Sequence, residues 1–423
     1  MRRLIISQIA LPSTQAVVTL GLTLVAMISS ALAGDCPQIL GPQRNGQAQN
    51  ETLAESWPDT GPPTIWKRDL GSGYAGAAVV GDACILFHRQ ADQSVVERLD
   101  AATGQRRWKK TFPTRYVSTI APDNGPRCTP LIYQDFVYLF GADGELHALS
   151  LADGQLKWTR ELYKDCNAPS GYFGAGSSPI VEGDELLVNV GGKQGQGIVA
   201  FDRNSGQTLW HQTDELASYS SPVAATIGDL RQVIFVTRMN VVSIDPRTGA
   251  ERFRFPFGMR GPTVNAANPL VVGDRLFVTA SYGIGAQLAQ ISPAGAKKVW
   301  GNDDALSSQY TTPIEHHGFL YGIHGRQDAG VAELRCVELE TGNVRWKQPD
   351  FGTANLIGVD DKLLIQKTSG ELVLAQASPD RFIQLATARI FPEGGVVQAL
   401  PALSDGRLFV RNESKLVVLH VGR

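Results

Sequence analysis

Short apolar runs separated by polar turns follow one another along most of the chain. In residues 178–212 the runs are "SPIVEG", "ELLVNVGG", "GIVAFD" and "QTLWHQ", and Gly, Asp, Asn and Ser stand between them. Runs this short, bounded by turn-forming residues, are typical of β-strands joined by tight hairpins. The apolar N-terminus is the one segment with a convincing helical pattern. The pattern therefore predicts an all-β protein.

The unit of these strands and turns recurs along the sequence. A turn followed by an aromatic residue appears as "LDAATGQRRW" (99–108), "LSLADGQLKW" (149–158), "FDRNSGQTLW" (201–210), "IDPRTGAERF" (244–253) and "VELETGNVRW" (337–346). A proline that opens an apolar run stands at Pro130, Pro179, Pro222, Pro269 and Pro313, with spacings of 49, 43, 47 and 44 residues. Pro401 follows after 88 residues, and Leu356 takes the proline position halfway between. One uninterrupted array of about 45-residue units is indicated.

The D-x-x-T-G turn has a structural explanation. Glycine adopts the positive φ that a tight hairpin requires, and a short aspartate side chain accepts bonds from the free amides of the turn. The aromatic residue four positions later lies in an outer strand, where a flat ring can pack against the next unit. A cofactor site repeated this often would be unusual, so the motif predicts a hairpin with an inter-blade anchor.

Because each unit has one aromatic anchor, the number of anchors gives the number of blades. They stand at Trp66, Trp108, Trp158, Trp210, Phe253, Trp300 and Trp346, with a degenerate copy near Ile383. The last unit, from Pro401, stops before its fourth strand, whereas "TIWKRDL" around Trp66 has no unit before it. Residues 64–423 number 360, or eight units of about 45. We expect an eight-bladed β-propeller of four-stranded antiparallel blades, closed by the N-terminal strand.

The N-terminus has the pattern of a secretory signal peptide. Arg2 and Arg3 precede an uncharged apolar run, and small residues lead to Ala33. We expect residues 1–33 to be removed, residues 34–63 to form a leader segment, and the mature protein to be periplasmic or secreted without stable membrane insertion. Loss of two arginines takes the net charge from −2 to −4, which offers no basic surface for nucleic acid.

Five cysteines remain after such processing: Cys36, Cys84, Cys128, Cys166 and Cys336. Their wide spacing matches neither a zinc site nor a disulfide-stapled miniprotein. Cys128 and Cys166 occupy comparable loops of neighbouring repeats. The sequence allows two alternatives for them, a disulfide bond or two free thiols.

The repeats resemble the pyrroloquinoline-quinone-like repeat propellers, whose hallmark is the D-x-x-T-G-x-x-x-W hairpin. The resemblance runs from about Gly41 to the C-terminus and is strongest to secreted members of planctomycete-type bacteria, on "GPQRNG", "GPRCTP", "SYGIGA", "GELVLAQASPD" and "GRLFVRN". It implies the propeller fold but little about activity. Such propellers include quinone-dependent alcohol dehydrogenases and the non-catalytic propeller of the outer-membrane β-barrel assembly machine.

A quinone site needs an aromatic floor, arginines, calcium ligands and a general base. Six of the seven tryptophans are repeat anchors, and Trp57 lies in the leader. The resemblance implies a lid of adjacent cysteines in the dehydrogenases, and this chain has none. We expect no cofactor and no metal, with pyrroloquinoline quinone and calcium as the alternative.

Loops leading into the proline strands should meet at one end of the central channel. They carry a set of contact-prone residues, joined by a tyrosine of "SYGIGA": Arg127, Tyr172, Tyr219, Asn265, Tyr310 and Tyr282. We expect this set to form a partner or ligand surface of a monomeric, non-catalytic scaffold that binds envelope or secreted proteins. A quinone-dependent oxidoreductase and a carbohydrate-binding propeller remain the alternatives.

Overall fold

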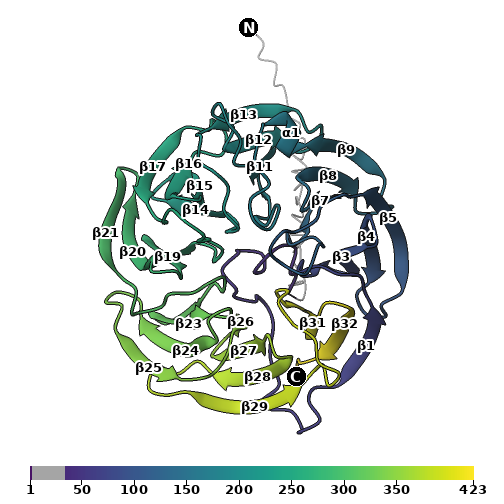
Figure 1. Cartoon of the computed structure of the whole chain (residues 1–423), viewed down its shortest axis with the longest axis vertical. Helices are drawn as coiled ribbons and strands as arrows, with labels where there is room; N and C mark the ends of the chain where they lie inside the picture. Colours follow the sequence, from purple (N-terminus) through teal and green to yellow (C-terminus); the bar gives the residue numbers. More distant parts are fainter. Residues whose placement is uncertain (2–33) are drawn as a thin grey trace. The chain divides into compact units, whose positions relative to one another are not determined.

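The structure is a computed structural model that describes residues 34–423, together with Met1. The signal peptide predicted for residues 1–33 otherwise lies outside the described residues. Within residues 34–423, eight four-stranded antiparallel sheets follow one another around a ring (Figure 1). The predicted eight-bladed all-β propeller is confirmed.

The first four blades are continuous in sequence, each running from its innermost to its outermost strand. Blade 1 comprises β2 (Ala78–Val80), β3 (Ala83–Gln90), β4 (Gln93–Asp100) and β5 (Arg106–Pro113). Blade 2 comprises β6 (Leu131–Tyr133), β7 (Phe136–Phe140), β8 (Glu145–Ser150) and β9 (Leu156–Glu161). Blade 3 comprises β10 (Ile180–Glu182), β11 (Glu185–Asn189), β12 (Ile198–Asp202) and β13 (Thr208–Gln212). Blade 4 comprises β14 (Val223–Ile227), β15 (Leu230–Val236), β16 (Asn240–Ile244) and β17 (Glu251–Pro256).

The next three blades repeat this order, and the last borrows a strand. Blade 5 comprises β18 (Leu270–Val272), β19 (Arg275–Ala280), β20 (Gly285–Ser292) and β21 (Gly295–Asn302). Blade 6 comprises β22 (Ile314–His316), β23 (Phe319–Arg326), β24 (Val331–Glu338) and β25 (Val344–Gln348). Blade 7 comprises β26 (Ala354–Val359), β27 (Lys362–Lys367), β28 (Glu371–Gln376) and β29 (Ile383–Arg389). Blade 8 comprises β30 (Ala402–Ser404), β31 (Arg407–Arg411), β32 (Lys415–His420) and β1 (Thr64–Asp69). One short helix, α1 (Leu162–Asp165), follows β9 in the described chain.

Closure of the ring depends on β1. This strand pairs antiparallel with β32, with Trp66 opposite Val418 and Lys67 opposite Val417. The N-terminal strand thus completes the C-terminal blade and leaves no open sheet edge between the two ends. The predicted closure is confirmed.

Each repeat tryptophan joins its blade to the turn of the next blade. The indole N–H of Trp210 donates to the carbonyl of Pro246 at 3.0 Å, and its ring covers Gly249, where a Cβ would lie 2.6 Å from the ring. The other five repeat tryptophans make the same kind of bond at 2.8–3.1 Å. In the turns, Asp202 Oδ1 accepts the amide of Ser205 at 2.8 Å, as the motif predicts.

The prediction for the eighth anchor is wrong by three residues. A bulge precedes every anchor, so that Trp210 faces Ala200 and Trp346 faces Cys336. In blade 7 the same register places Ala386, not Ile383, opposite Leu374. Without an aromatic side chain to mark the position, the bulge cannot be located from sequence.

The hydrophobic core is divided among the seams between blades. Eight clusters of buried side chains occur in the described chain, and each is built from two neighbouring blades. The seam between blades 8 and 1 contains Phe409 and Val418 on one side and Val79 and Leu86 on the other. The ring is therefore held by side-by-side packing of blades.

The cysteines are buried in this core as free thiols. Cys128 and Cys166 belong to one cluster between blades 2 and 3 but are not bridged. The Cys128 thiol instead donates to the carbonyl of Ser177 at 3.5 Å. Burial raises the pKa of the Cys166 thiol to about 11, so it remains protonated at neutral pH.

Candidate functional site

The antiparallel order of the strands gives the propeller two different faces. Within a blade the innermost strand begins, and the outermost strand ends, at the same edge of the sheet. The connections between blades therefore meet on one face, together with the hairpins between the second and third strands. We call this the funnel face.

A cavity of about 460 Å³ occupies the centre of the funnel face. Its lining combines aromatic and amide side chains with smaller apolar residues, among them Ile39 and Leu400. The polar and aromatic members are Tyr74, Arg127, Thr129, Phe173, Tyr219, Tyr282, Gln309, Tyr310, Gln327, Asp328, Asn355 and Gln398. A cavity with this lining is suited to hold a neutral, partly apolar group.

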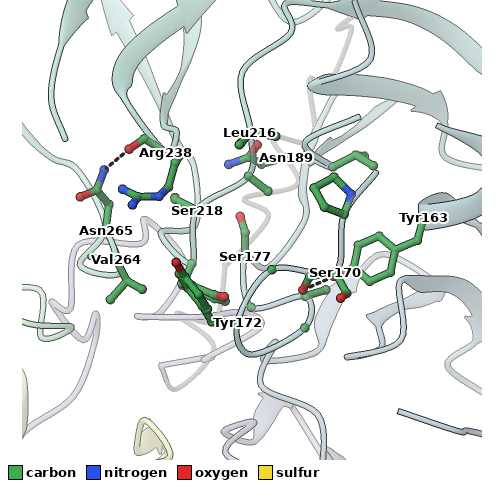
Figure 2. Close-up of a pocket in the computed structure, with 18 of the residues that line it drawn as sticks. Tyr163, Ser170, Tyr172, Ser177, Asn189, Leu216, Ser218, Arg238, Val264 and Asn265 are labelled. Atoms are coloured by element: carbon green, nitrogen blue, oxygen red, sulfur yellow. Dashed lines mark hydrogen bonds between the residues drawn. The ribbon is translucent and has the colours of Figure 1, made fainter. Parts of the chain in front are cut away.

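Four of the six predicted surface residues line this funnel. Arg127, Tyr219 and Tyr310 come from connections between blades, and Tyr282 comes from the β19–β20 hairpin. The other two, Tyr172 and Asn265, line a separate cavity nearer to blades 3 and 4 (Figure 2). Tyr219 lines both cavities.

The funnel tyrosines are fixed by amide side chains. The hydroxyl of Tyr310 donates to Gln327 Oε1 at 3.0 Å, and Gln398 Nε2 donates to the same oxygen at 2.9 Å. Gln309 Nε2 donates to the hydroxyl of Tyr282 at 2.9 Å. These bonds join blades 5, 6, 7 and 8 across the mouth of the funnel. The two phenol rings are thereby held in place.

Arg127 is held against two aromatic rings. Its guanidinium donates to the carbonyls of Gly125 at 2.7 Å and Asp123 at 2.9 Å. The guanidinium carbon lies 5.7 Å from the ring centre of Tyr74 and 5.5 Å from that of Tyr116, within the range of a cation–π contact. Burial, reinforced by the nearby Asp123 charge, raises the pKa of Tyr74 to about 12. Tyr74 is therefore a neutral phenol at physiological pH.

Sequence reasoning missed the residues that complete the funnel. Gln327 and Asp328 lie at the tip of the β23–β24 hairpin, in "GRQDAG", and Tyr74 lies in "GSGYAG". The second-to-third-strand hairpins could have been singled out, because the strand order places their tips on the same face as the blade connections.

The leader was also missed as a structural element. Residues 36–53, which we call the plug, run across the centre of the ring (Figure 1). Cys36 bridges to Val79 of blade 1, Gln47 to Gly358 of blade 7, and Leu53 to Gly422 beyond blade 8.

Arg44 anchors the plug. Its side chain is 1% exposed and donates to the carbonyls of Ser178 (3.3 Å), Pro222 (2.9 Å) and Pro179, and to Gln38 Oε1 (2.8 Å). The only hint in the sequence was its place in the "GPQRNG" motif.

The funnel residues do not match a calcium-held quinone. Asp328 is the one carboxylate among the described residues of the lining, and it is paired with Arg326. A calcium site requires about six to eight oxygen ligands, usually including several carboxylates. Trp57 packs against the cluster between blades 7 and 8 and is not part of the funnel.

No group of three or more His, Cys, Asp or Glu side chains in residues 34–423 is arranged to hold a metal ion. No helix of that region has the length and apolar character needed to cross a bilayer.

Comparison with known proteins gives concordant sequence matches. A family model described as outer membrane protein assembly factor BamB matches residues 58–193 and 91–348. The protein of that name from Yersinia pestis is 24% identical over 298 residues, which is 66% of this chain and 66% of the relative. The one from Moranella endobia is 27% identical over 215 residues, 49% of this chain and 46% of the relative. The matches thus span about two thirds or less of the length of these curated relatives.

Solved structures show the same fold. BamB from Moraxella catarrhalis superposes with a TM-score of 0.60 at 18% identity, covering 84% of this chain and 96% of that one. Quinohemoprotein alcohol dehydrogenase from Comamonas testosteroni superposes with a TM-score of 0.64 at 13% identity, covering 92% of this chain and 81% of that one. BamB, named as an assembly factor, and an enzyme thus share this architecture, and the fold does not choose between their activities.

Proposed function

The chain belongs to the family of the outer membrane protein assembly factor BamB, and from this premise we propose that it is a non-catalytic scaffold that binds envelope proteins outside the cytoplasm. The observation that carries the proposal is a set of exposed apolar side chains on the funnel face. Exposed apolar groups gathered on one face mark sites of protein interaction.

These apolar side chains surround the funnel on the loops of several blades. Each is at least 36% exposed, and each lies on a blade connection or on the β23–β24 hairpin: Val117, Ile120, Tyr172, Leu216, Met259, Val331 and Val396. With the aromatic funnel between them, they form an apolar and aromatic surface of the kind that protein interfaces favour.

The chemistry of the funnel supports binding over catalysis. Two of its tyrosines, Tyr282 and Tyr310, bond to amide side chains, and Asp328, the one carboxylate among its described lining residues, is paired with Arg326. A general base must have a free basic atom that can reach a substrate proton, and this lining supplies only a carboxylate already held in an ion pair.

The chain offers a matched pair of leucines for a test of the binding surface. Leu216 is 47% exposed on the funnel face, and Leu209 is 49% exposed on the outer strand β13. A photo-crosslinking amino acid at position 216, in the envelope of the organism that encodes the protein, should capture one or a few envelope proteins. The same amino acid at position 209 should capture none.

Substitution provides the second half of this experiment. Leu216→Asp should lower capture of the partner at least tenfold, whereas Leu209→Asp should leave it unchanged. Equal crosslinking at both positions, or none at either, would contradict the proposal. So would stoichiometric binding of pyrroloquinoline quinone and calcium with alcohol-dependent dye reduction, which would establish the enzymatic alternative.

A further inference from the structure

A second cavity on the funnel face lies away from the central axis. Its volume is about 250 Å³, and its walls come from α1, the end of β11, and the connections that flank blades 3 and 4. Figure 2 shows the hydroxyl of Ser177 and the amide of Asn189 directed into the same space, with Arg238 and Asn265 on one side.

Three buried polar side chains of this cavity have unused hydrogen-bonding atoms. Asn189 is 2% exposed, and neither its amide nitrogen nor its amide oxygen has a partner among residues 34–423. The hydroxyl of Ser177, also 2% exposed, and Oδ1 of Asn265, 0% exposed, are likewise unpaired within the described chain. Buried polar atoms are nearly always bonded in proteins, so this group points to a ligand.

The unpaired atoms define the ligand as neutral. Asn189 offers both a donor and an acceptor, Asn265 an acceptor, and Ser177 a hydroxyl that can serve as either. Within residues 34–423, Arg238 is the one charged residue in the lining, and its guanidinium already donates to the carbonyls of Met259 at 2.9 Å and Gly261 at 2.7 Å. A cation would find no carboxylate here, and an anion would face two amide oxygens.

The remaining walls are apolar and aromatic. Phe140 and Val190 are buried beside the cavity, and the rings of Tyr163 and Tyr219 complete the lining. Tyr172, 42% exposed, lies at the rim. The cavity therefore combines a neutral polar end with an aromatic wall.

We infer that this cavity binds a single neutral sugar ring. Adjacent hydroxyls of a sugar act as both donors and acceptors, as the atoms of Asn189, Ser177 and Asn265 require, while its C–H face packs on the aromatic wall. The volume lies just below the range of about 300–1,000 Å³ usual for drug-sized ligands, and it suits one such ring. The site shares Tyr172 and Leu216 with the protein-binding surface, but it is inferred from the unpaired atoms of Asn189, Ser177 and Asn265 and does not depend on the proposed protein binding.

Ligand-detected saturation-transfer NMR tests the site with glucose, galactose and N-acetylglucosamine as probes. We expect at least one of them to bind the purified protein with a Kd of about 1 mM or tighter. Asn189→Leu should weaken that binding at least tenfold. Because this change removes an unpaired buried amide, the thermal midpoint should stay unchanged or rise.

Two further variants complete the design. Ser177→Ala should also weaken binding, and it serves if Asn189→Leu fails to fold. Tyr310→Phe removes a hydroxyl from the central funnel and should leave sugar binding unchanged.

Three results would overturn the inference. The first is absence of binding by all three sugars at about 10 mM. The second is equal binding by the wild type and both pocket variants. The third is binding of propionamide, but of no sugar, in a manner that depends on Asn189, which would assign the pocket to a carboxamide.

Discussion

Five of the six repeat tryptophans rest on a glycine of the following blade, and Trp346 is the exception. The ring of Trp158 covers Gly206, whose φ is +71° and whose added Cβ would lie 2.7 Å from the ring. Glycine is therefore required at this position for two reasons: its backbone conformation disfavours any side chain, and the tryptophan ring already occupies the space that a Cβ would need. The turn glycine of one repeat and the tryptophan of the preceding repeat therefore pack against each other across the seam between blades.

Gly206→Ala should separate these two requirements when compared with Gly273→Ala. Gly273 has a φ of +59°, but among the described residues no atom lies within 4 Å of its added Cβ. Gly273→Ala should lower the free energy of unfolding by about 1–2 kcal/mol through backbone strain alone. Gly206→Ala should cost about 1–3 kcal/mol more, because it also displaces Trp158. Urea unfolding measures both, and equal losses would show that the ring contact contributes nothing.

At the scale of elements, the closing strand is tied to the first blade by a buried carboxylate. Glu97 of β4 is 2% exposed and bonds to Arg68 of β1 at 3.1 Å and to Arg106 of β5 at 3.2 Å. His88 Nδ1 accepts the amide of Gly71, so its Nε2 carries the proton toward Glu97, at 3.4 Å. Burial lowers the pKa of His88, which favours this neutral form.

The closure should weaken in acid. Burial alone would raise the pKa of Glu97, but the bond to His88 and the charges of Arg68 and Arg106 outweigh it and lower the pKa to about 2. The unfolded chain, with a Glu pKa of about 4.5, then binds the proton more readily than the folded protein between pH 4.5 and 2. Stability from Glu97 is complete above about pH 4.5 and is lost as the pH falls toward 2.

Glu97→Gln should lower the free energy of unfolding by about 2 kcal/mol at pH 7 and reduce its dependence on pH below 4.5. The exposed pair of Arg275 and Glu340 provides the control. Glu340→Gln should change stability by less than about 0.5 kcal/mol. Denaturant unfolding of the three proteins across pH 3–7 checks this. An unchanged acid slope in Glu97→Gln would contradict the assignment.

At the scale of the whole molecule, the plug and the funnel make the two ends of the ring unequal. The plug is fixed to hairpins on the face opposite the funnel, where Glu51 accepts the amides of Asp405 and Gly406 at 2.5 and 2.8 Å. Arg44 then reaches carbonyls of blades 3 and 4 from the centre. A ligand or partner therefore meets the central cavity from the funnel face.

Arg44→Ala should loosen the plug without opening the ring. Loss of a charged donor to several buried carbonyls should cost about 3 kcal/mol, and the leader should become sensitive to protease while residues 64–423 stay protected. Arg115→Ala, at an exposed position on a blade connection, is the matched control and should have no effect. Limited proteolysis with mass spectrometry measures both, and a leader that stays protected in Arg44→Ala would contradict the role of Arg44.

The candidate site could be predicted only in part. Arg127, Tyr219, Tyr282 and Tyr310 line one funnel because the repeat fixes which loops share a face. The sequence predicts Asn265 as a surface residue, but it is buried, and its amide nitrogen donates to Thr237 O at 2.9 Å. Side-chain direction within an irregular loop follows from tertiary packing, which no local pattern encodes.

The sequence alone determined the propeller, its eight blades and its closure, because each depends on signals repeated in every unit or on an unpaired strand at each end. Even there, the register of the eighth anchor, at Ala386 opposite Leu374 in blade 7, needed the observed bulge. Only the tertiary structure shows that Arg44 donates to the carbonyl of Pro222 and that Asn189 and Ser177 line the same cavity. Those contacts join residues far apart in the chain and occur once each, so no repeated sequence pattern predicts them.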